Sequence, residues 1–237
     1  MPEKELKADM NPFQNQQPQL IQTADGSHTL FVAAANEHYH SVHGAIAESM
    51  HVYIQSGFEM IAKNFEEINI LEIGFGTGLN ALLTYFQNQK YAKRINYTSI
   101  EAYPLGKNIY SKLNYQDFLD YPEKDILLKM HTCQWNEPVH FSEYFTLLKV
   151  VTSLETFNPE KEKYHLIYFD AFAPQIQPEL WTKEIFEKCF SSLQTKGFLM
   201  TYSAKGEVKR NLKHAGFCIE NIPGPKGKRE ITRGIKV

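Results

Sequence analysis

Residues 70–80 read Ile70-Leu71-Glu72-Ile73-Gly74-Phe75-Gly76-Thr77-Gly78-Leu79-Asn80. In this stretch an apolar run containing one acid leads directly into a glycine-rich turn. Glycine has no Cβ and readily adopts positive φ, so such a turn lets a ligand approach the backbone closely. The residues that follow have helical character, and the free N–H groups of that helix should point into the same crevice. Strand, turn and helix together predict the nucleotide-binding end of a Rossmann-like sheet.

The spacing of the glycines distinguishes between two kinds of nucleotide cofactor. The dinucleotide fingerprint G-x-G-x-x-G/A, counted from Gly74, requires Gly or Ala where this chain has Leu79. Glu72 stands just before the turn, and its negative charge would repel a pyrophosphate. S-adenosylmethionine has no phosphate and carries cationic groups, so both features favour it over NAD. We therefore expect S-adenosylmethionine as the cofactor, with an NAD-dependent dehydrogenase as the disfavoured alternative.

The length and composition fit an ordinary globular protein. The chain has 237 residues, of which 43% are hydrophobic and 22% charged, with a net charge of −2. No apolar run is long enough to span a bilayer, and residues 1–10 are charged rather than signal-like, so we expect no membrane association and a cytoplasmic location. The three cysteines are scattered, which fits reduced thiols. The group His38, His40, His43 and His51 matches no zinc spacing, so no metal is expected.

The chain divides into two expected parts. Residues 1–64 should form an N-terminal extension packed on a methyltransferase-type domain, residues 65–237. Within the extension, residues 1–20 are polar and should be irregular, Leu20–Val32 should form a hairpin around an Asp-Gly turn, and residues 41–64 should form a helix with apolar side chains every 3.6 residues.

Strands and helices alternate in the second part, which predicts an α/β fold with a mostly parallel seven-stranded sheet covered on both faces. The expected strands are Ile68–Ile73, Ile95–Glu101, Leu147–Thr152, His165–Asp170, Gly197–Ser203, Phe217–Asn221 and Glu230–Val237. The expected helices are Leu79–Asn88, Pro104–Tyr115, Pro178–Gln194 and Gly206–Ala215. Cofactors bind outside the carboxyl ends of such strands, so function should be sought in the loops that follow them.

Two acids stand at these strand ends. Glu101 ends the second strand of the domain, where a carboxylate can accept hydrogen bonds from both ribose hydroxyls. Asp170 ends the fourth strand and opens a stiff loop that contains Phe172, Pro174 and Trp181. Amine methyltransferases place an Asp- or Asn-led loop with Pro and aromatic residues at this point, where it positions a neutral amine. A fixed carboxylate also stabilises the positive charge that moves onto the nitrogen, so Asp170 is the expected catalytic residue.

The C-terminal part of the chain is basic although the whole is nearly neutral. From residue 205 onward there are nine Lys and Arg residues and three Glu residues, a local excess of +6. A basic surface of this kind is compatible with nucleic-acid binding, and equally with a solvated helix face and a lysine-rich loop.

Taken together, these residues resemble the methyltransferase half of the MnmC-type enzymes, which modify the wobble uridine of tRNA. The matching segments are Tyr39-His40-Ser41, Gly44-Ala45, Glu48-Ser49, Gly74–Asn80, Asp170–Pro174 with Pro178 and Trp181, Thr201-Tyr202-Ser203 and Gly227-Lys228-Arg229-Glu230. They extend over most of the chain. The resemblance implies a class I S-adenosylmethionine-dependent methyltransferase that converts 5-aminomethyl(-2-thio)uridine to 5-methylaminomethyl(-2-thio)uridine. No second glycine-rich flavin turn is present, so the resemblance is to a stand-alone, MnmD-like methyltransferase domain, with separate enzymes supplying the amine.

The resemblance and the strand-end reasoning give two sets of expected contacts. Cofactor contacts are expected from Glu72, Gly74, Phe75, Gly76, Thr77, Gly78, Asn80, Glu101, Thr152 and Asp170. Contacts to the substrate, the anticodon loop of tRNA, are expected from Tyr39, Ser41, Glu48, Phe172, Pro174, Trp181, Tyr202, Lys228 and Arg229, with the aromatic residues stacking on splayed bases. The family usually has an acid that meets the adenine amine where this chain has Thr152.

Three other functions remain open on the sequence. One is a small-molecule amine N-methyltransferase or polyamine-synthase-like enzyme with the same cofactor site. The second is the NAD-dependent dehydrogenase, and the third is a non-enzymatic RNA-binding module. The basic C-terminal stretch favours an RNA substrate over a small amine, and Asp170 favours an enzyme over a binding module.

Overall fold

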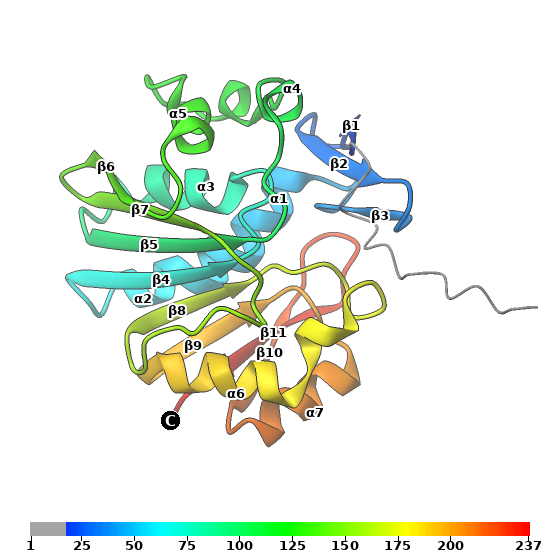
Figure 1. Cartoon of the computed structure of the whole chain (residues 1–237), viewed down its shortest axis with the longest axis vertical. Helices are drawn as coiled ribbons and strands as arrows, with labels where there is room; N and C mark the ends of the chain where they lie inside the picture. The colour runs from blue at the N-terminus through cyan, green and yellow to red at the C-terminus, as the bar shows by residue number, and fades with distance from the viewer. Residues whose placement is uncertain (1–17) are drawn as a thin grey trace, which may run out of the picture.

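A computed structural model describes residues 18–237 (Figure 1). The irregular structure expected for the N-terminal residues concerns mainly residues 1–17, which lie outside the described residues. The strands are β1 (Gln19–Gln22), β2 (His28–Val32), β3 (Glu37–His38), β4 (Glu67–Ile73), β5 (Arg94–Glu101), β6 (Pro138–Ser142), β7 (Phe145–Val151), β8 (Tyr164–Phe169), β9 (Leu193–Thr201), β10 (Cys218–Pro223) and β11 (Glu230–Ile235). The α-helices are α1 (Ala45–Ser49), α2 (Glu59–Ala62), α3 (Leu79–Asn88), α4 (Lys107–Tyr110), α5 (Ile126–Thr132), α6 (Lys183–Ser192) and α7 (Gly206–His214). A π-helix η1 (Met50–Phe58) joins α1 to α2, and two 3₁₀ turns are η2 (Tyr115–Phe118) and η3 (Pro178–Trp181).

The main sheet has the strand order β10-β11-β9-β8-β4-β5-β7-β6. The five strands from β9 to β7 run parallel, whereas β11, β10 and β6 are antiparallel to their neighbours. The expected Rossmann-like class I α/β fold is therefore confirmed. The expected strand number of seven is wrong by one, because β6 adds an eighth strand. β6 was missed because it is a short edge strand with alternating exposure that begins at Pro138, a residue typical of edges.

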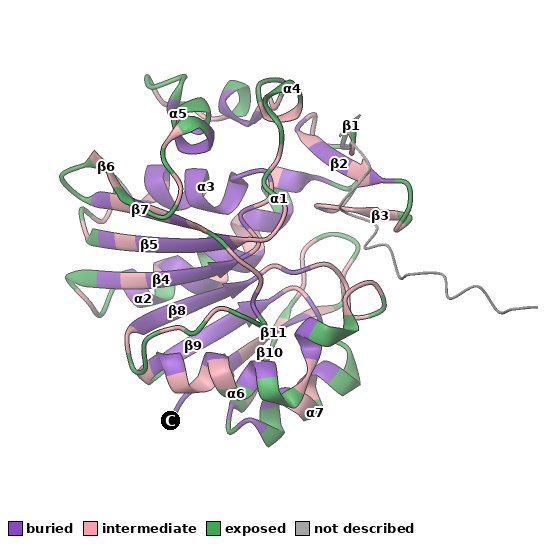
Figure 2. Cartoon of the chain, viewed as in Figure 1, coloured by how far each residue is buried: buried purple, intermediate pink, exposed green. Residues whose placement is uncertain are grey.

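Helices cover both faces of the sheet, and each face has its own core (Figure 2). On β4, Ile68 and Ile70 pack in one cluster with α3 and η1, while Leu71 and Ile73 pack in the other with α6 and α7. This alternation follows from the two-residue period of a strand that is buried on both faces. The apolar run that precedes the glycine turn thus anchors the turn in the middle of the molecule.

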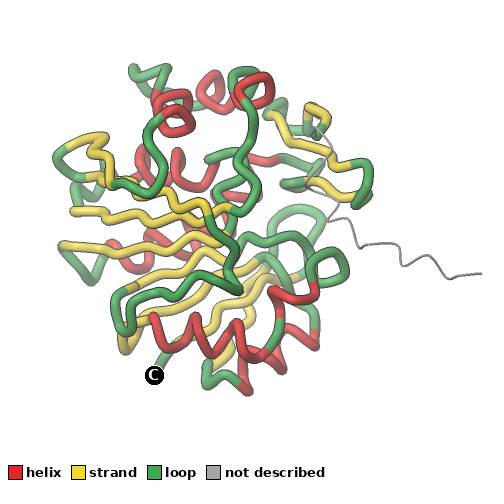
Figure 3. Tube along the Cα trace, viewed as in Figure 1, coloured by secondary structure: helices red, strands yellow, loops and turns green. Residues whose placement is uncertain are grey.

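The N-terminal segment forms a second, three-stranded sheet and a continuous helical segment from α1 through η1 to α2 (Figure 3). The predicted Asp-Gly hairpin is present, with β1 and β2 antiparallel. The predicted helix over residues 41–64 is present but shorter. Gly57 lets η1 lie close to the sheet, because a Cβ there would stand 3.3 Å from Met200 and 3.4 Å from Tyr168.

Two regions of the domain differ from the prediction. The helix expected over Pro104–Tyr115 is reduced to one turn, α4, because Pro104 and Gly106 delay its start and the chain turns again before Tyr115. Helix α5 was not expected at all. Both regions lie at the same end of the sheet, between β5 and β6 in sequence.

Candidate active site

A cavity of about 870 Å³ opens at the carboxyl ends of the parallel strands. Its lining comes from the loops that follow β4, β5, β7 and β8, from the segment Glu37–Glu48 and from Lys228. A volume of this size is typical of small-molecule sites, and the position is the one that open parallel sheets use for cofactors. The N-terminal extension and the C-terminal β10–β11 loop thus complete a site whose floor belongs to the central sheet.

The glycine turn forms part of the cavity wall. Gly74 and Gly76 have φ values of 92° and 49°, in the left-handed region that other residues adopt at a cost. A Cβ on Gly74 would stand 3.1 Å from the carbonyl oxygen of Asp170, and one on Gly76 would stand 3.2 Å from the ring of Tyr39. The absence of side chains at these positions therefore lets three separate segments meet at the turn.

A buried group behind the turn holds it in place. Nε2 of His131 lies 3.0 Å from the carbonyl oxygen of Thr77, and a carbonyl only accepts, so Nε2 carries the proton. Burial lowers the pKa of His131 to about 4, which keeps the ring neutral. The ammonium of Lys149 donates to the carbonyl of His131 at 2.9 Å and lies over the rings of Trp135 and Phe75. No local sequence pattern predicts this support, since Thr77, His131 and Lys149 are far apart in the chain.

Glu101 closes the β5 side of the cavity. Its Oε2 accepts from the backbone N–H of Gly76 at 2.9 Å, and its Oε1 accepts from that of Tyr103 at 2.8 Å. Burial raises the pKa of Glu101, and these backbone donors partly offset that rise. Thr152 directly follows the neighbouring strand β7, lines the cavity and donates its backbone N–H to the Glu101 carbonyl. Both residues lie where the sequence placed them.

Asp170 lies on the opposite side of the turn with two fixed donors. The hydroxyl of Tyr53 donates to Oδ1 at 2.7 Å, and Nδ2 of Asn80 donates to Oδ2 at 2.8 Å. Burial raises the pKa of Asp170, while nearby His40 and the two donors lower it. Each carboxylate oxygen accepts from one of these two donors, which leaves a further lone pair for a ligand, and Asp170 lines the cavity. Tyr53 was missed as a site residue, because in the sequence it fits the apolar period of a helix.

The loop after Asp170 is fixed through its carbonyl groups. The hydroxyl of Tyr202 donates to the carbonyl of Ala171 at 2.9 Å, and the indole of Trp181 donates to that of Phe172 at 2.8 Å. Trp181 is only 3% exposed, so it supports the loop from within the core and offers no face to a base, contrary to the expectation. Phe172 faces the cavity in an edge-to-face contact with Tyr39, at 4.9 Å between ring centroids.

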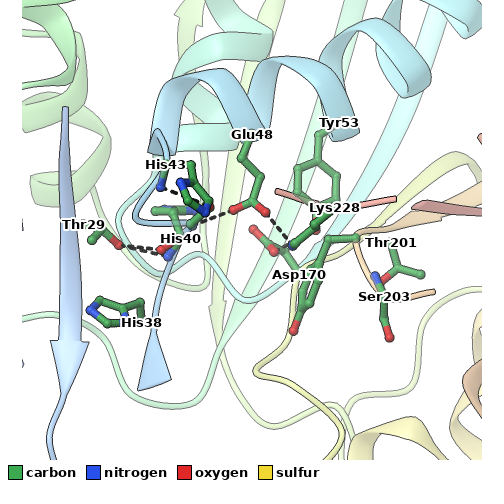
Figure 4. Close-up of polar contacts among 12 residues, drawn as sticks. Thr29, His38, His40, His43, Glu48, Tyr53, Asp170, Thr201, Ser203 and Lys228 are labelled. Atoms are coloured by element: carbon green, nitrogen blue, oxygen red, sulfur yellow. Dashed lines mark hydrogen bonds and ion pairs between the residues drawn. The ribbon is translucent and has the colours of Figure 1, made fainter. Parts of the chain in front are cut away.

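An ion pair lies beside Asp170 at this end of the cavity (Figure 4). Nζ of Lys228 is 2.5 Å from Oε1 of Glu48 and 4.1 Å from the centre of the Tyr202 ring. The other oxygen of Glu48 accepts from the backbone N–H of Ser41 at 2.7 Å. The structure therefore brings together four residues that the sequence assigned to the substrate, from both ends of the chain.

Five expected site residues do not line the cavity: Glu72, Gly78, Pro174, Trp181 and Arg229. Glu72 is fully buried beneath the turn, where it accepts from the hydroxyl of Ser99 at 2.6 Å. Burial raises the pKa of Glu72 to about 8. Because Glu72 is buried and does not line the cavity, it is not placed to make the direct cofactor contact that we expected. A Cβ on Gly78 would stand 3.0 Å from Phe75 and 3.2 Å from Leu127, and Arg229 is exposed next to Lys228 in sequence.

The charge of the lining favours a cationic ligand. Six carboxylates and one lysine line the cavity among the residues that the structure describes. An acidic wall attracts a sulfonium and an ammonium and repels a pyrophosphate. Within residues 18–237 no cluster of three or more His, Cys, Asp or Glu side chains is arranged to hold a metal ion. No described helix combines the length and the apolar character needed to cross a membrane.

Comparison with known sequences agrees with this geometry. A family model described as S-adenosyl-L-methionine-dependent methyltransferase matches residues 112–237. The chain is 31% identical over 206 residues to the Campylobacter hominis protein named tRNA 5-methylaminomethyl-2-thiouridine biosynthesis bifunctional protein MnmC, covering 86% of this chain and 31% of that protein. A protein of the same name from Cupriavidus metallidurans is 28% identical over 209 residues, covering 82% of this chain and 30% of that protein. The chain thus spans about a third of the length of these curated relatives.

Two solved structures share the architecture. MNMC2 from Aquifex aeolicus matches with a TM-score of 0.78 and 25% identity over 94% of this chain and 71% of that one. Spermidine synthase from Thermotoga maritima matches with a TM-score of 0.57 and 12% identity over 92% of this chain and 67% of that one, a likeness of fold alone. The predicted resemblance to the methyltransferase half of MnmC-type proteins is confirmed.

Proposed function

Because the chain belongs to the S-adenosyl-L-methionine-dependent methyltransferase family, we propose that it methylates the amine of 5-aminomethyl(-2-thio)uridine at the wobble position of tRNA. The product would be 5-methylaminomethyl(-2-thio)uridine. The names of the relatives and of the MNMC2 structure support the tRNA substrate. The observation that carries the proposal is the Asp170 carboxylate, fixed by two donors between the glycine turn and an aromatic, polar end of the cavity.

The residues present fit the methyl donor. The cavity is large enough, its wall is acidic, and Glu101 and Thr152 stand at the strand ends where ribose and adenine are held in such sheets. When bound, S-adenosylmethionine supplies the methyl group together with the positive charge that the reaction moves onto nitrogen. The acidic wall would repel the pyrophosphate of NAD, which counts against the NAD-dependent dehydrogenase alternative.

The role of Asp170 is to hold and polarise the acceptor. A lone pair on its carboxylate accepts an N–H of the neutral amine and so aims the nitrogen lone pair. As the new bond forms, positive charge develops on nitrogen, and the carboxylate stabilises it in a partly buried site. Because burial raises the pKa of Asp170, the same carboxylate is a suitable acceptor for the proton that the methylated ammonium releases. Tyr53 and Asn80 keep its orientation fixed throughout.

Exposed basic residues of the C-terminal part would contact the RNA phosphates: Arg210, Lys213, Lys226 and Arg229. Two other basic residues of this part are paired, Lys209 with Glu230 and Arg233 with Glu220. The basic excess read from the sequence is therefore only partly available for phosphates. Separate enzymes would supply the aminomethyl group, and a cytoplasmic location remains a prediction.

The proposal is tested with an anticodon stem-loop RNA that carries 5-aminomethyluridine at the wobble position. Wild-type protein with S-adenosylmethionine should add one methyl group to this nucleoside, detected by mass spectrometry of the digested RNA. Asp170→Asn should slow single-turnover methylation by about 10²–10³-fold while S-adenosylhomocysteine still binds in calorimetry. Unmethylated RNA in the presence of bound cofactor would contradict the proposal.

A small-molecule amine substrate is separated from tRNA by a second measurement. Arg229→Ala should weaken binding of the stem-loop RNA. It should leave binding of S-adenosylhomocysteine unchanged, because Arg229 does not line the cavity. If the protein methylates free polyamines as fast as the RNA, and Arg229→Ala changes neither rate, the small-molecule alternative is correct.

A further inference from the structure

Glu48 and Lys228 are not used by the methyl-transfer step, although both line the cavity beside Asp170. They are 180 residues apart in sequence, and the ion pair joins helix α1 to the β10–β11 loop. Their side chains are 10% and 31% exposed, respectively. A pair of this kind contributes little to stability, because desolvation offsets most of the attraction between the charges. The position of the pair therefore calls for a role toward the ligand.

Both partners keep hydrogen-bonding capacity for a ligand. Lys228 has three N–H donors and uses one on Glu48. Its ammonium group also makes a cation–π contact with the ring of Tyr202. Each carboxylate oxygen of Glu48 has one protein donor, Lys228 on Oε1 and Ser41 on Oε2, and so keeps a free lone pair. The pair thus presents an N–H donor directly next to an oxygen acceptor. Figure 4 shows Asp170 and Tyr53 beside it.

A donor next to an acceptor matches one pyrimidine edge and opposes the other. Uracil presents the O4 acceptor beside the N3–H donor, so Lys228 can donate to O4 while Glu48 accepts from N3–H. Cytosine presents an amino donor at position 4 beside the N3 acceptor, which would put donor against donor and lone pair against lone pair. Unpaired polar groups in a closed site are strongly unfavourable.

The placement of the pair agrees with the chemistry at carbon 5. The aminomethyl group is attached to the ring atom next to the one that carries O4. With the amine held by Asp170, the base can turn O4 and then N3 toward the ion pair, which lies beside Asp170 (Figure 4). Phe172 and Tyr39 provide aromatic surface in the lining of the same cavity.

We propose that the Glu48–Lys228 pair reads the O4/N3–H edge of the acceptor base and restricts methylation to 5-aminomethyl uracils, rejecting the matching cytosines. This proposal rests on the proposed function, because it assigns the base that carries the amine. It also places no requirement on the 2-position, so oxygen and sulfur there should be accepted alike by this pair.

The test compares two stem-loop RNAs that differ only in the wobble base, 5-aminomethyluridine or 5-aminomethylcytidine. Wild-type protein should methylate the uridine RNA with a kcat/KM about ten- to a hundredfold higher than that for the cytidine RNA. Equal rates on both RNAs would overturn the edge assignment and leave the proposed function standing. Methylation of neither RNA, with S-adenosylhomocysteine still bound, would overturn the proposed function and this assignment with it.

Variants of the pair give a sharper readout. Lys228→Met should reduce the uridine-to-cytidine ratio by about tenfold, mainly by slowing the uridine RNA. The double variant Glu48→Lys with Lys228→Glu keeps an ion pair but exchanges donor and acceptor, so its preference should turn toward cytidine. Lys226→Met, in the same loop but exposed, is the matched control and should leave the ratio unchanged. A double variant that is folded by circular dichroism and binds S-adenosylhomocysteine, yet keeps the wild-type ratio, would refute the proposal.

Discussion

The hydroxyl of Tyr53 donates a 2.7 Å hydrogen bond to Oδ1 of Asp170, from a helix of the N-terminal extension to the end of a central strand. This bond and the one from Asn80 orient the carboxylate and stabilise its ionised form, against a burial that favours the protonated form. The orientation of the proposed catalytic group is thus set in part by Tyr53, a residue of the N-terminal helical segment.

Tyr53→Phe should move the acid limb of the pH–rate profile to higher pH. The hydrogen bond lowers the pKa of Asp170, so its removal raises that pKa, and the carboxylate is lost at a higher pH as the solution is acidified. We expect kcat to fall about tenfold at neutral pH, with part of the loss recovered at alkaline pH. Tyr91→Phe, at a tyrosine far from the cavity, is the control. An unshifted acid limb in Tyr53→Phe would show that the bond does not tune Asp170.

Glu72→Gln should stabilise the protein at alkaline pH. The folded-state pKa of Glu72 is about 8, raised by burial above its ordinary value of 4.5. The unfolded chain therefore loses this proton at lower pH than the folded chain does, and stability falls as pH rises from about 4.5 to about 8. Gln cannot ionise, so the variant should gain on the order of 5 kcal/mol over wild type at pH 9 and nothing from this cause at pH 4. Urea unfolding at both pH values measures the difference, and equal gains at both would contradict the raised pKa.

His131→Phe should weaken cofactor binding without touching the cavity. The change removes the N–H that holds the Thr77 carbonyl, so the glycine turn loses a fixed contact. The dissociation constant for S-adenosylhomocysteine should rise about three- to tenfold, corresponding to about 1 kcal/mol for one hydrogen bond. His140→Phe, on the exposed edge strand β6, is the matched control and should bind normally. Calorimetry at a temperature where both variants remain folded separates the local effect from unfolding.

Thr152→Asp should tighten cofactor binding. The resemblance to MnmC-type enzymes places an acid at this position, where it would accept a hydrogen bond from the adenine amine. Thr152 lines the cavity, and its hydroxyl oxygen lies 3.0 Å from the hydroxyl oxygen of Thr156. A carboxylate there should lower the dissociation constant for S-adenosylhomocysteine about fivefold, and Asn, which offers an oxygen without charge, should give a smaller gain. Weaker binding in Thr152→Asp would mean that repulsion by nearby Glu101 outweighs the new bond.

The parts of the fold that the sequence predicted well are those with strong local signals. The strands β4, β5 and β8 are runs of β-branched and aromatic residues, and helix α3 was predicted with its observed bounds because Gly78 marks its start. The strand β6 and helix α5 carry weaker patterns, since β6 buries only part of one face and α5 follows a turn-rich stretch. Strand β6 depends on pairing with β7, and helix α5 depends on packing against α3. A local sequence pattern does not predict either contact.

The site shows the same division. Residues that belong to a strand end or a glycine turn, such as Glu101 and Asp170, were placed correctly on the cavity. Tyr53 was missed because a tyrosine in an apolar helical period is usually a core residue, and its hydroxyl contact is made 117 residues away in sequence. Trp181 was assigned to the substrate because of its loop, whereas its burial by Phe169 and Phe186 is a tertiary effect.

The helical segment from Ala45 to Ala62 carries both Glu48 and Tyr53, which belong to the proposed acceptor end, whereas the loops after β4 and β5 belong to the proposed donor end. On this proposal, changes within this one segment would alter which amine is accepted and leave the residues around the methyl donor intact. Within such a lineage, new acceptors would arise by divergence of the first quarter of the chain, and sequence comparison restricted to the glycine turn would not detect the change.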